Sequence, residues 1–211
     1  MENNTSKMVT LLGKIRKQMN GAVLDTFRYY GQNYGMNYGV AIHSLRDMAN
    51  QVGMDDSLAR FLYRQQVREL RIIALWIADS ATITAEDFDF WAAGIVNSEV
   101  AEQAAQALLC RIDAIDALLE AWSNADNELL AYCALLAAAR SKGVNEGVVE
   151  RVVKSVIARF ADNHLTAQGT VTLLSSLIAT NREFVKSLTA ALPDTHTASV
   201  VREEIAWRIE Y

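Results

Sequence analysis

The sequence predicts an all-α protein in which antiparallel helix pairs stack around a continuous core. Apolar residues make up 51% of the chain and charged residues 21%, a balance typical of globular proteins. One proline and ten glycines are too few to supply the turns of a many-stranded β protein. With 211 residues the chain is long enough for one domain, 1–211, with N-terminal helices and a loop in residues 1–39 and helix pairs in 40–211.

Clusters of Gly, Asn, Asp, Ser and Thr divide the chain into helical segments. Residues 31–39, rich in glycine and tyrosine, are expected to form an ordered loop. Thr84 and Asp87 suit a capping box at a helix start, and Asn97 or Ser98 is expected to cap the helix that follows and ends near 112. The other predicted helices cover residues 8–19, 22–30, 42–51, 56–64, 67–78, 84–96, 114–122, 127–142, 146–161, 165–179, 182–192 and 198–209.

The pattern of apolar residues predicts layers of helix pairs. Segment 146–161 has a one-sided apolar stripe, which is typical of a half-exposed helix, whereas 129–139 is apolar on nearly every face and must be enclosed. Candidate pairs begin at Ala41, Thr84, Asn127 and Leu165, spaced 43, 43 and 38 residues apart. This spacing is close to the roughly 40–47 residues of HEAT repeats. We therefore expect an α-solenoid, an α-α superhelix of HEAT-like antiparallel helix pairs.

Several classes of function lack their sequence signals. The polar N-terminus does not resemble a secretory signal, and the longest run of bulky apolar residues, 72–78, is too short to cross a membrane. Cys110 and Cys133 are expected to be free thiols, because no His or Cys lies at metal-ligand spacing. No glycine-rich phosphate loop is present. The sequence thus predicts a cytoplasmic protein with no metal, cofactor or membrane partner, and with its four tryptophans packed in the core.

Charge is distributed unevenly along the chain. Residues 1–71 carry a net charge of +4, residues 72–139 a net charge of −10 and residues 140–211 a net charge of +1. A surface that holds nucleic acid needs cations to neutralise phosphates. Only the two ends of this chain could supply them, and the acidic middle would suit a basic protein partner instead.

Three stretches resemble the AlkD-like DNA alkylation repair family. They are residues 38–49 (YGVAIHSLRDMA), residues 58–79 (LARFLYRQQVRELRIIALWIAD), and residues 87–91 (DFDFW) followed by 97–103 (NSEVAEQ). The second is similar to the family's short helix, break and Arg-Glu-x-Arg entry into a buried helix. The resemblance covers about residues 36–103, and the rest of the chain follows the family mainly in helix order.

The resemblance implies a HEAT-like solenoid whose concave face holds duplex DNA, and an alkylpurine DNA glycosylase activity in some members. The family's catalytic aspartate falls at Glu102, which keeps the carboxylate but adds a methylene. Its other site positions are replaced, by Ser98 for a tryptophan, Tyr132 for an arginine and Thr172 for a second tryptophan. A displacement of about an ångström in a positioned site can cost roughly 100-fold in rate. We therefore expect reduced or absent glycosylase activity, with an active glycosylase using Glu102 as the alternative.

Basic residues near the two ends are the candidates for contact with DNA phosphates. The candidates are four arginines that form one stripe if their helix is continuous, two lysines near the N-terminus and two basic residues of the segment 146–161. They are Arg60, Arg64, Arg68, Arg71, Lys14, Lys17, Arg151 and Lys154. A break near residue 65 would divide the stripe into two pairs. Each of these side chains could instead belong to a solvated helix face. A protein-interaction scaffold is the third hypothesis, since solenoids present long grooves to partners.

Overall fold

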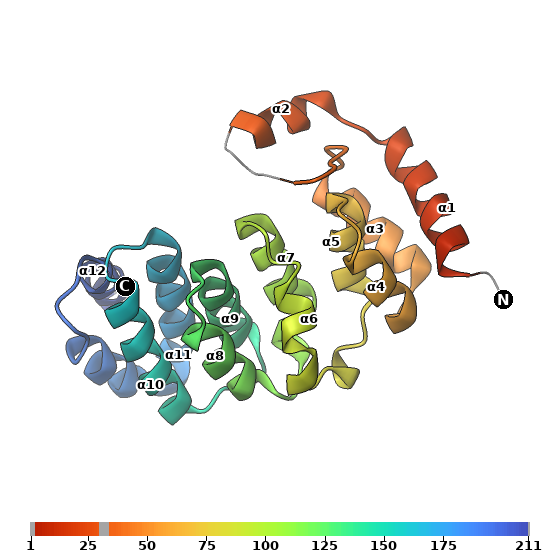
Figure 1. Cartoon of the computed structure of the whole chain (residues 1–211). Helices are drawn as coiled ribbons and strands as arrows, with labels where there is room; N and C mark the ends of the chain where they lie inside the picture. Colours follow the sequence, from red (N-terminus) through yellow and green to blue (C-terminus); the bar gives the residue numbers. More distant parts are fainter. Residues whose placement is uncertain (1–2, 30–33, 211) are drawn as a thin grey trace. The chain divides into compact units, whose positions relative to one another are not determined.

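The computed structural model describes residues 3–29 and 34–210 of the chain (Figure 1). These residues form twelve α-helices, three short 3₁₀ helices and no strand, which confirms the predicted all-α fold. The helices belong to two compact units, Met1–Thr82 and Ile83–Tyr211, called here the N-terminal and the C-terminal unit. The single-domain organisation predicted from the sequence stays a prediction.

The N-terminal unit contains the first five helices. Helix α5 packs against both α3 and α4, and α1 lies across α4 and α5. The chain breaks between α4 and α5, so the predicted arginine stripe is divided into two pairs. The bounds of these helices are α1 (Asn4–Lys17), α2 (Gly21–Tyr29), α3 (Ile42–Val52), α4 (Asp56–Tyr63) and α5 (Arg68–Ile77).

The segment before α3 is held against the start of α5 by backbone hydrogen bonds. Met36 forms an isolated parallel bridge with Val67, in which Met36 N donates to the Gln66 carbonyl and Arg68 N donates to the Met36 carbonyl, both at 2.8 Å. Gly39 has φ +69°, and a Cβ there would lie 2.3 Å from the Asn20 carbonyl oxygen, so only glycine fits. Residues 34–39 of the predicted loop are ordered, and its residues 31–33 lie outside the described residues.

The C-terminal unit contains the remaining seven helices in two layers. Helix α9 packs against both α7 and α11 in one layer, and α8 packs against α10 in the other. Figure 1 shows α8 to α11 side by side in this unit. The bounds are α6 (Phe88–Ala92), α7 (Ser98–Ala107), α8 (Ile115–Asn124), α9 (Glu128–Arg140), α10 (Glu146–Arg159), α11 (His164–Ala190) and α12 (His196–Glu210).

Asparagine side chains start most helices of these layers. Asn97 accepts a hydrogen bond from Val100 N, which selects Asn97 over Ser98 as the cap of α7. Asn residues at 127, 145 and 163 cap α9, α10 and α11 in the same way. Such caps satisfy backbone amides that have no partner inside the helix. The capping box of Thr84 and Asp87 is also present, but it opens a 3₁₀ turn and the short α6 rather than a helix over 84–96.

The predicted pattern of burial is confirmed for two helices of the C-terminal unit. In α9 every residue from 131 to 138 is buried, whereas in α10 only the valine and isoleucine stripe is. Cys110 and Cys133 are free, and Cys133 is buried. The expectation that all four tryptophans are packed in the core was wrong for Trp207. Trp207 on α12 is 61% exposed, because α12 packs on α11 and no described helix covers its other face.

Segments 165–179 and 182–192, predicted as separate helices, are joined in α11. Asn181 between them has non-helical angles, φ −149° and ψ 76°. Its side chain accepts from Phe184 N and donates to the Glu146 carboxylate on α10. The kink is therefore a cap that starts a second helical segment. No helix among residues 3–29 and 34–210 is long and apolar enough to cross a membrane.

Candidate functional site

The structure brings two of the predicted site residues into contact. Tyr132 on α9 donates a hydrogen bond from its hydroxyl to Glu102 Oε1 on α7, at 3.1 Å. Glu102 is exposed, while Tyr132 is only 1% exposed. Burial raises the pKa of the Tyr132 phenol above its usual value near 10, and the neighbouring Glu102 carboxylate raises it further. Tyr132 is therefore a neutral donor at physiological pH.

Close packing between α9 and α11 holds the tyrosine ring in place. Gly169 on α11 faces α9, and a Cβ there would lie 3.1 Å from Tyr132 Cδ2 and 3.1 Å from Leu135 Cδ1. On the other side, the Cys133 thiol donates to the Ala101 carbonyl of α7 at 3.2 Å. The orientation of Tyr132 toward Glu102 therefore depends on three helices at once.

The other two predicted positions lie on the same layer of helices. Ser98 precedes Glu102 by one turn on α7, which places both on one face of the helix. Thr172 follows Gly169 by three residues on α11, and its hydroxyl donates to the Gln168 carbonyl at 2.8 Å. The hydroxyl of Thr172 is thus already bonded within its own helix. All four positions lie on α7, α9 and α11.

The chemistry that this arrangement can support is limited. An exposed carboxylate could stabilise a cationic sugar, provided that charged and aromatic groups hold the reacting nucleotide beside it. Among the described residues Glu102 bonds to a neutral phenol and has no ion-pair partner. Serine and threonine at positions 98 and 172 offer no aromatic face. The site retains the carboxylate but not the groups that would position a lesion.

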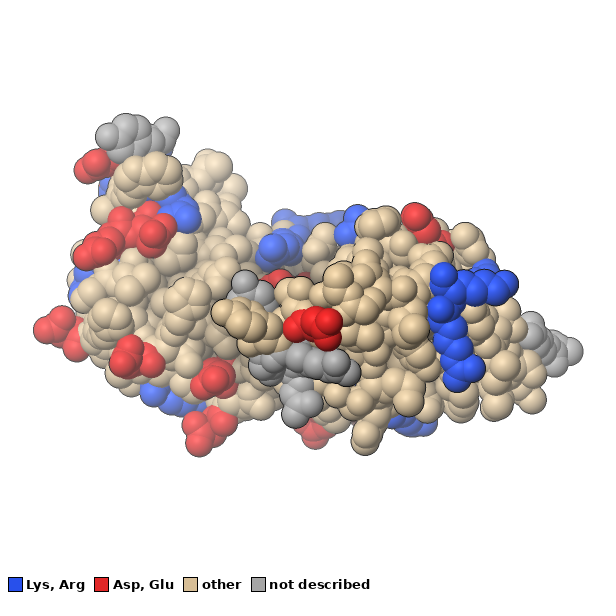
Figure 2. Space-filling model, turned by 90° about the horizontal axis from the view of Figure 1, so that it is seen from above, with Lys and Arg blue, Asp and Glu red and all other residues tan. Residues whose placement is uncertain are grey.

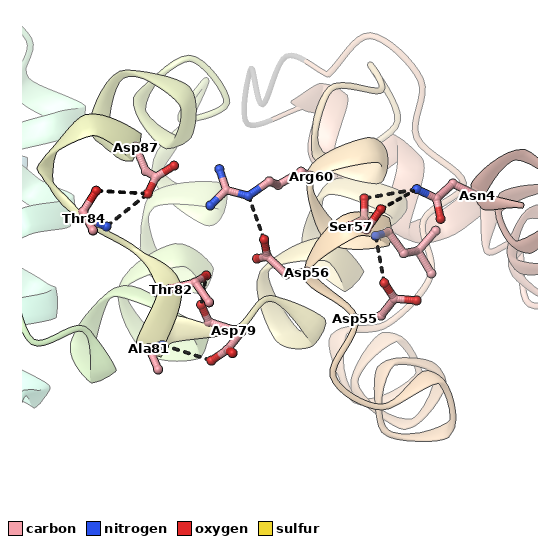
Figure 3. Close-up of polar contacts among 11 residues, drawn as sticks. Asn4, Asp55, Asp56, Ser57, Arg60, Asp79, Ala81, Thr82, Thr84 and Asp87 are labelled. Carbon is pink, nitrogen blue, oxygen red and sulfur yellow. Dashed lines mark hydrogen bonds and ion pairs between the residues drawn. The ribbon is translucent and has the colours of Figure 1, made fainter.

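The four arginines of the predicted stripe have different environments. Arg60 Nε donates to Asp56 Oδ2 at 2.8 Å within α4 (Figure 3). Arg64 at the end of α4 is exposed. Arg71 is half-buried, and its guanidinium donates to the Tyr63 and Gln65 carbonyls at 3.4 Å. The prediction that Arg68 contacts DNA was wrong, because its side chain is buried and only 2% of the residue is exposed.

Arg68 instead forms a buried ion pair with Glu69. Its Nη1 donates to Glu69 Oε1 at 3.1 Å and to the Val40 carbonyl at 2.8 Å, and its guanidinium lies 4.6 Å from the Phe27 ring centre. Glu69 Oε1 also accepts from the backbone of Tyr38 and Val40. The Arg-Glu pair of the sequence motif therefore joins residues 38–40 to α5. Its role is structural.

The remaining basic candidates lie on α1 and α10. Lys14 and Lys17 are exposed, and Lys14 Nζ donates to the neutral Gln51 side chain. Neither lysine forms an ion pair with any of residues 3–29 and 34–210. Arg151 and Lys154 are paired with carboxylates, at 2.5 Å from Glu120 and 2.6 Å from Glu150. In the view of Figure 2, Lys and Arg side chains form a run on the N-terminal unit, while Asp and Glu are spread over the C-terminal unit.

Arg46 is a basic residue that the spacing of charges along the sequence does not indicate. On α3 its guanidinium stacks over the Trp76 ring of α5, 4.5 Å from the ring centre. The Nε of Arg46 and the Nε1 of Trp76 are both buried without a hydrogen-bond partner. Arg46 forms no ion pair within the described part of the chain. A single arginine on an amphipathic helix forms no spacing pattern with other basic residues. Only the packing of α3 on α5 shows that Arg46 lies against Trp76.

Comparisons with known proteins agree with this architecture. A family model described as DNA alkylation repair enzyme matches residues 13–187. The chain is also similar to a solved structure from a family of proteins related to the HEAT-like repeat DNA glycosylases with affinity for branched DNA structures. The TM-score is 0.70 at 14% identity, over 96% of this chain and 95% of that one, which shows a shared fold. No curated protein matches the sequence.

Proposed function

Because the chain belongs to the DNA alkylation repair enzyme family, we propose that it binds duplex or branched DNA and that its glycosylase activity is reduced or lost. The proposal of reduced or lost glycosylase activity rests on the contact between Glu102 and Tyr132. The carboxylate of Glu102 is bonded to a neutral phenol, and the other three site positions, Ser98, Tyr132 and Thr172, hold neither arginine nor tryptophan.

The charge of the two units supports DNA binding through the N-terminal unit. Residues 1–82 contain ten Lys and Arg against seven Asp and Glu, a net charge of +3, whereas residues 83–211 have a net charge of −8. Phosphate contacts supply most of the affinity for DNA. The affinity of the structurally similar family for branched DNA supports the same proposal.

The residues proposed to contact phosphates follow from their environments. Lys14, Lys17 and Arg64 are exposed, and Arg46 is held in position by Trp76. Arg60, Arg71 and Lys154 remain weaker candidates because they are only partly exposed, and Arg151 remains one because Glu120 pairs with it.

A salt titration of DNA binding tests the first part of the proposal. Fluorescence anisotropy with a labelled duplex and a labelled three-way junction would compare the wild type with the triple variant of Lys14→Ala, Lys17→Ala and Arg64→Ala. Each lost phosphate contact is expected to reduce the slope of log affinity against log salt by about 1. Lys186→Ala, which removes an exposed charge from α11 in the acidic unit, is the control. Absence of binding at low salt would refute DNA binding and favour a protein scaffold with a basic partner.

Release of methylated base from alkylated DNA tests the second part. The proposal expects release no faster than in a sample without protein. Release that is abolished by Glu102→Gln would overturn it and establish the alternative, an active alkylpurine glycosylase. Tyr132→Phe is the matched variant, because it removes only the hydroxyl that bonds to Glu102.

A further inference from the structure

An open cavity lies between α11 and α12 in the C-terminal unit, and neither Glu102 nor Tyr132 is among its lining residues. It has a volume of about 610 Å³ and is lined by Ser175, Ile178, Ala179, Arg182 and Arg208. Figure 1 shows these two helices beside each other in this unit. Cavities of roughly 300–1,000 Å³ are the usual size for small-molecule sites. Two guanidiniums in one such cavity indicate an anionic ligand.

Arg182 supplies the free positive charge of this cavity. Its guanidinium has no ion-pair or hydrogen-bond partner among residues 3–29 and 34–210. The kink at Asn181 determines its place, because the Asn181 side chain is bonded to Glu146 and to Phe184 N and begins the second segment of α11 at residue 182. The start of a helical segment also favours negative charge.

Ser175 supplies an unused hydrogen-bonding group. Its hydroxyl oxygen is buried and has no hydrogen-bond partner. Most polar atoms that are removed from water have a partner in the protein or a ligand, since an unpaired one is costly. The hydroxyl oxygen does not face the cavity in this conformation, and a rotation about the Cα–Cβ bond of Ser175 would bring it to a ligand oxygen there.

Arg208 is shared with a second cavity and with one carboxylate. It lines the adjoining cavity of about 180 Å³, which includes His164, Gln168 and Glu204, and it forms an ion pair with Glu204. Its guanidinium also lies 6.0 Å from the ring centre of the exposed Trp207. Glu204 therefore lowers the positive potential of the site without removing it.

We propose that Ser175, Arg182 and Arg208 form a site for the phosphate group of a nucleotide, either free or within a DNA strand. Arginine suits phosphate because its planar fork donates two hydrogen bonds to adjacent oxygens. The cavity is open to solvent, so a sugar attached to the phosphate can extend out of it. This site does not depend on DNA binding by the N-terminal unit.

The test uses the full chain and two probes, a deoxynucleoside monophosphate and a labelled single-stranded oligonucleotide. Arg182→Ala is expected to weaken binding of the occupying probe by about tenfold or more, the usual loss for a charged hydrogen bond. Ser175→Ala is expected to weaken it less, and Glu204→Gln to strengthen it by freeing Arg208. Lys186→Ala is the control, because Lys186 lies on the same segment and pairs with Glu183 outside the cavity.

The two probes separate the two sources of the phosphate. Binding of the mononucleotide that depends on Arg182, with the oligonucleotide unaffected, assigns the site to a free nucleotide. Loss of oligonucleotide affinity in Arg182→Ala assigns it to a strand. The proposal is overturned if neither probe responds to Arg182→Ala, or if Lys186→Ala causes the same loss as Arg182→Ala.

Discussion

Replacing Arg68 by methionine tests whether the Arg-Glu pair of the sequence motif is structural. Methionine fills part of the same volume but leaves the Glu69 carboxylate, 0% exposed, without its cation. The Val40 carbonyl also loses the donor that lies 2.8 Å away. Removing one partner of a buried ion pair costs about 3–5 kcal/mol. Since whole domains are stable by about 5–15 kcal/mol, Arg68→Met should remove a large part of the stability.

Urea unfolding followed by circular dichroism measures this change, and Arg60→Met provides the matched control. The Arg60–Asp56 pair is half-exposed and spaced four residues apart on one helix, so its loss should cost about 0.3–0.5 kcal/mol. Amide exchange should also accelerate at Tyr38 and Val40, which donate to Glu69. If Arg68→Met and Arg60→Met have the same free energy of unfolding, the reasoning from burial is refuted.

Two further predictions concern a surface ion pair and a helix contact. A hydrogen bond from Lys7, at 2.6 Å, holds the pKa of Asp55 below its usual 3.8, so the pair stabilises the fold at neutral pH and loses this effect as pH falls through the lowered pKa. Lys7→Met should therefore lower the free energy of unfolding in urea at pH 7 by up to about 1 kcal/mol. At about pH 2 the same substitution should leave the free energy of unfolding unchanged. An equal loss at both pH values would contradict this. Gly169→Val should destabilise the protein by about 1–3 kcal/mol through overpacking, whereas Gly13→Ala, in open space on α1, should stabilise it by about 0.5–1 kcal/mol. Thermal unfolding compares the two, and a stable Gly169→Val would show that α9 and α11 can separate at no cost.

Local features of the structure follow directly from the sequence. The helix-forming composition, the apolar periods of α9 and α10, a cap at Asn97 or Ser98 and the break between α4 and α5 all depend on residues within one or two turns of each other. These short-range interactions are visible in any single chain. The family resemblance in residues 36–103 uses the same kind of local pattern, and the family model extends it to residues 13–187.

The environment of individual side chains was decided by tertiary packing. Arg68 reads as one member of an exposed basic stripe, yet residues 38–40 cover it, while Arg46 is positioned by a tryptophan 30 residues away. Trp207 reads as a core residue, yet no described helix covers its face.

What the sequence by itself determined is the all-α class, most of the helices, the layered burial of α9 and α10 and the family, because each depends on neighbours along the chain. Only the tertiary structure decided that Tyr132 bonds to Glu102 and that Arg182 and Arg208 line one cavity. Those contacts join different helices, and the spacing of residues along one helix carries no information about which side chain a neighbouring helix will present.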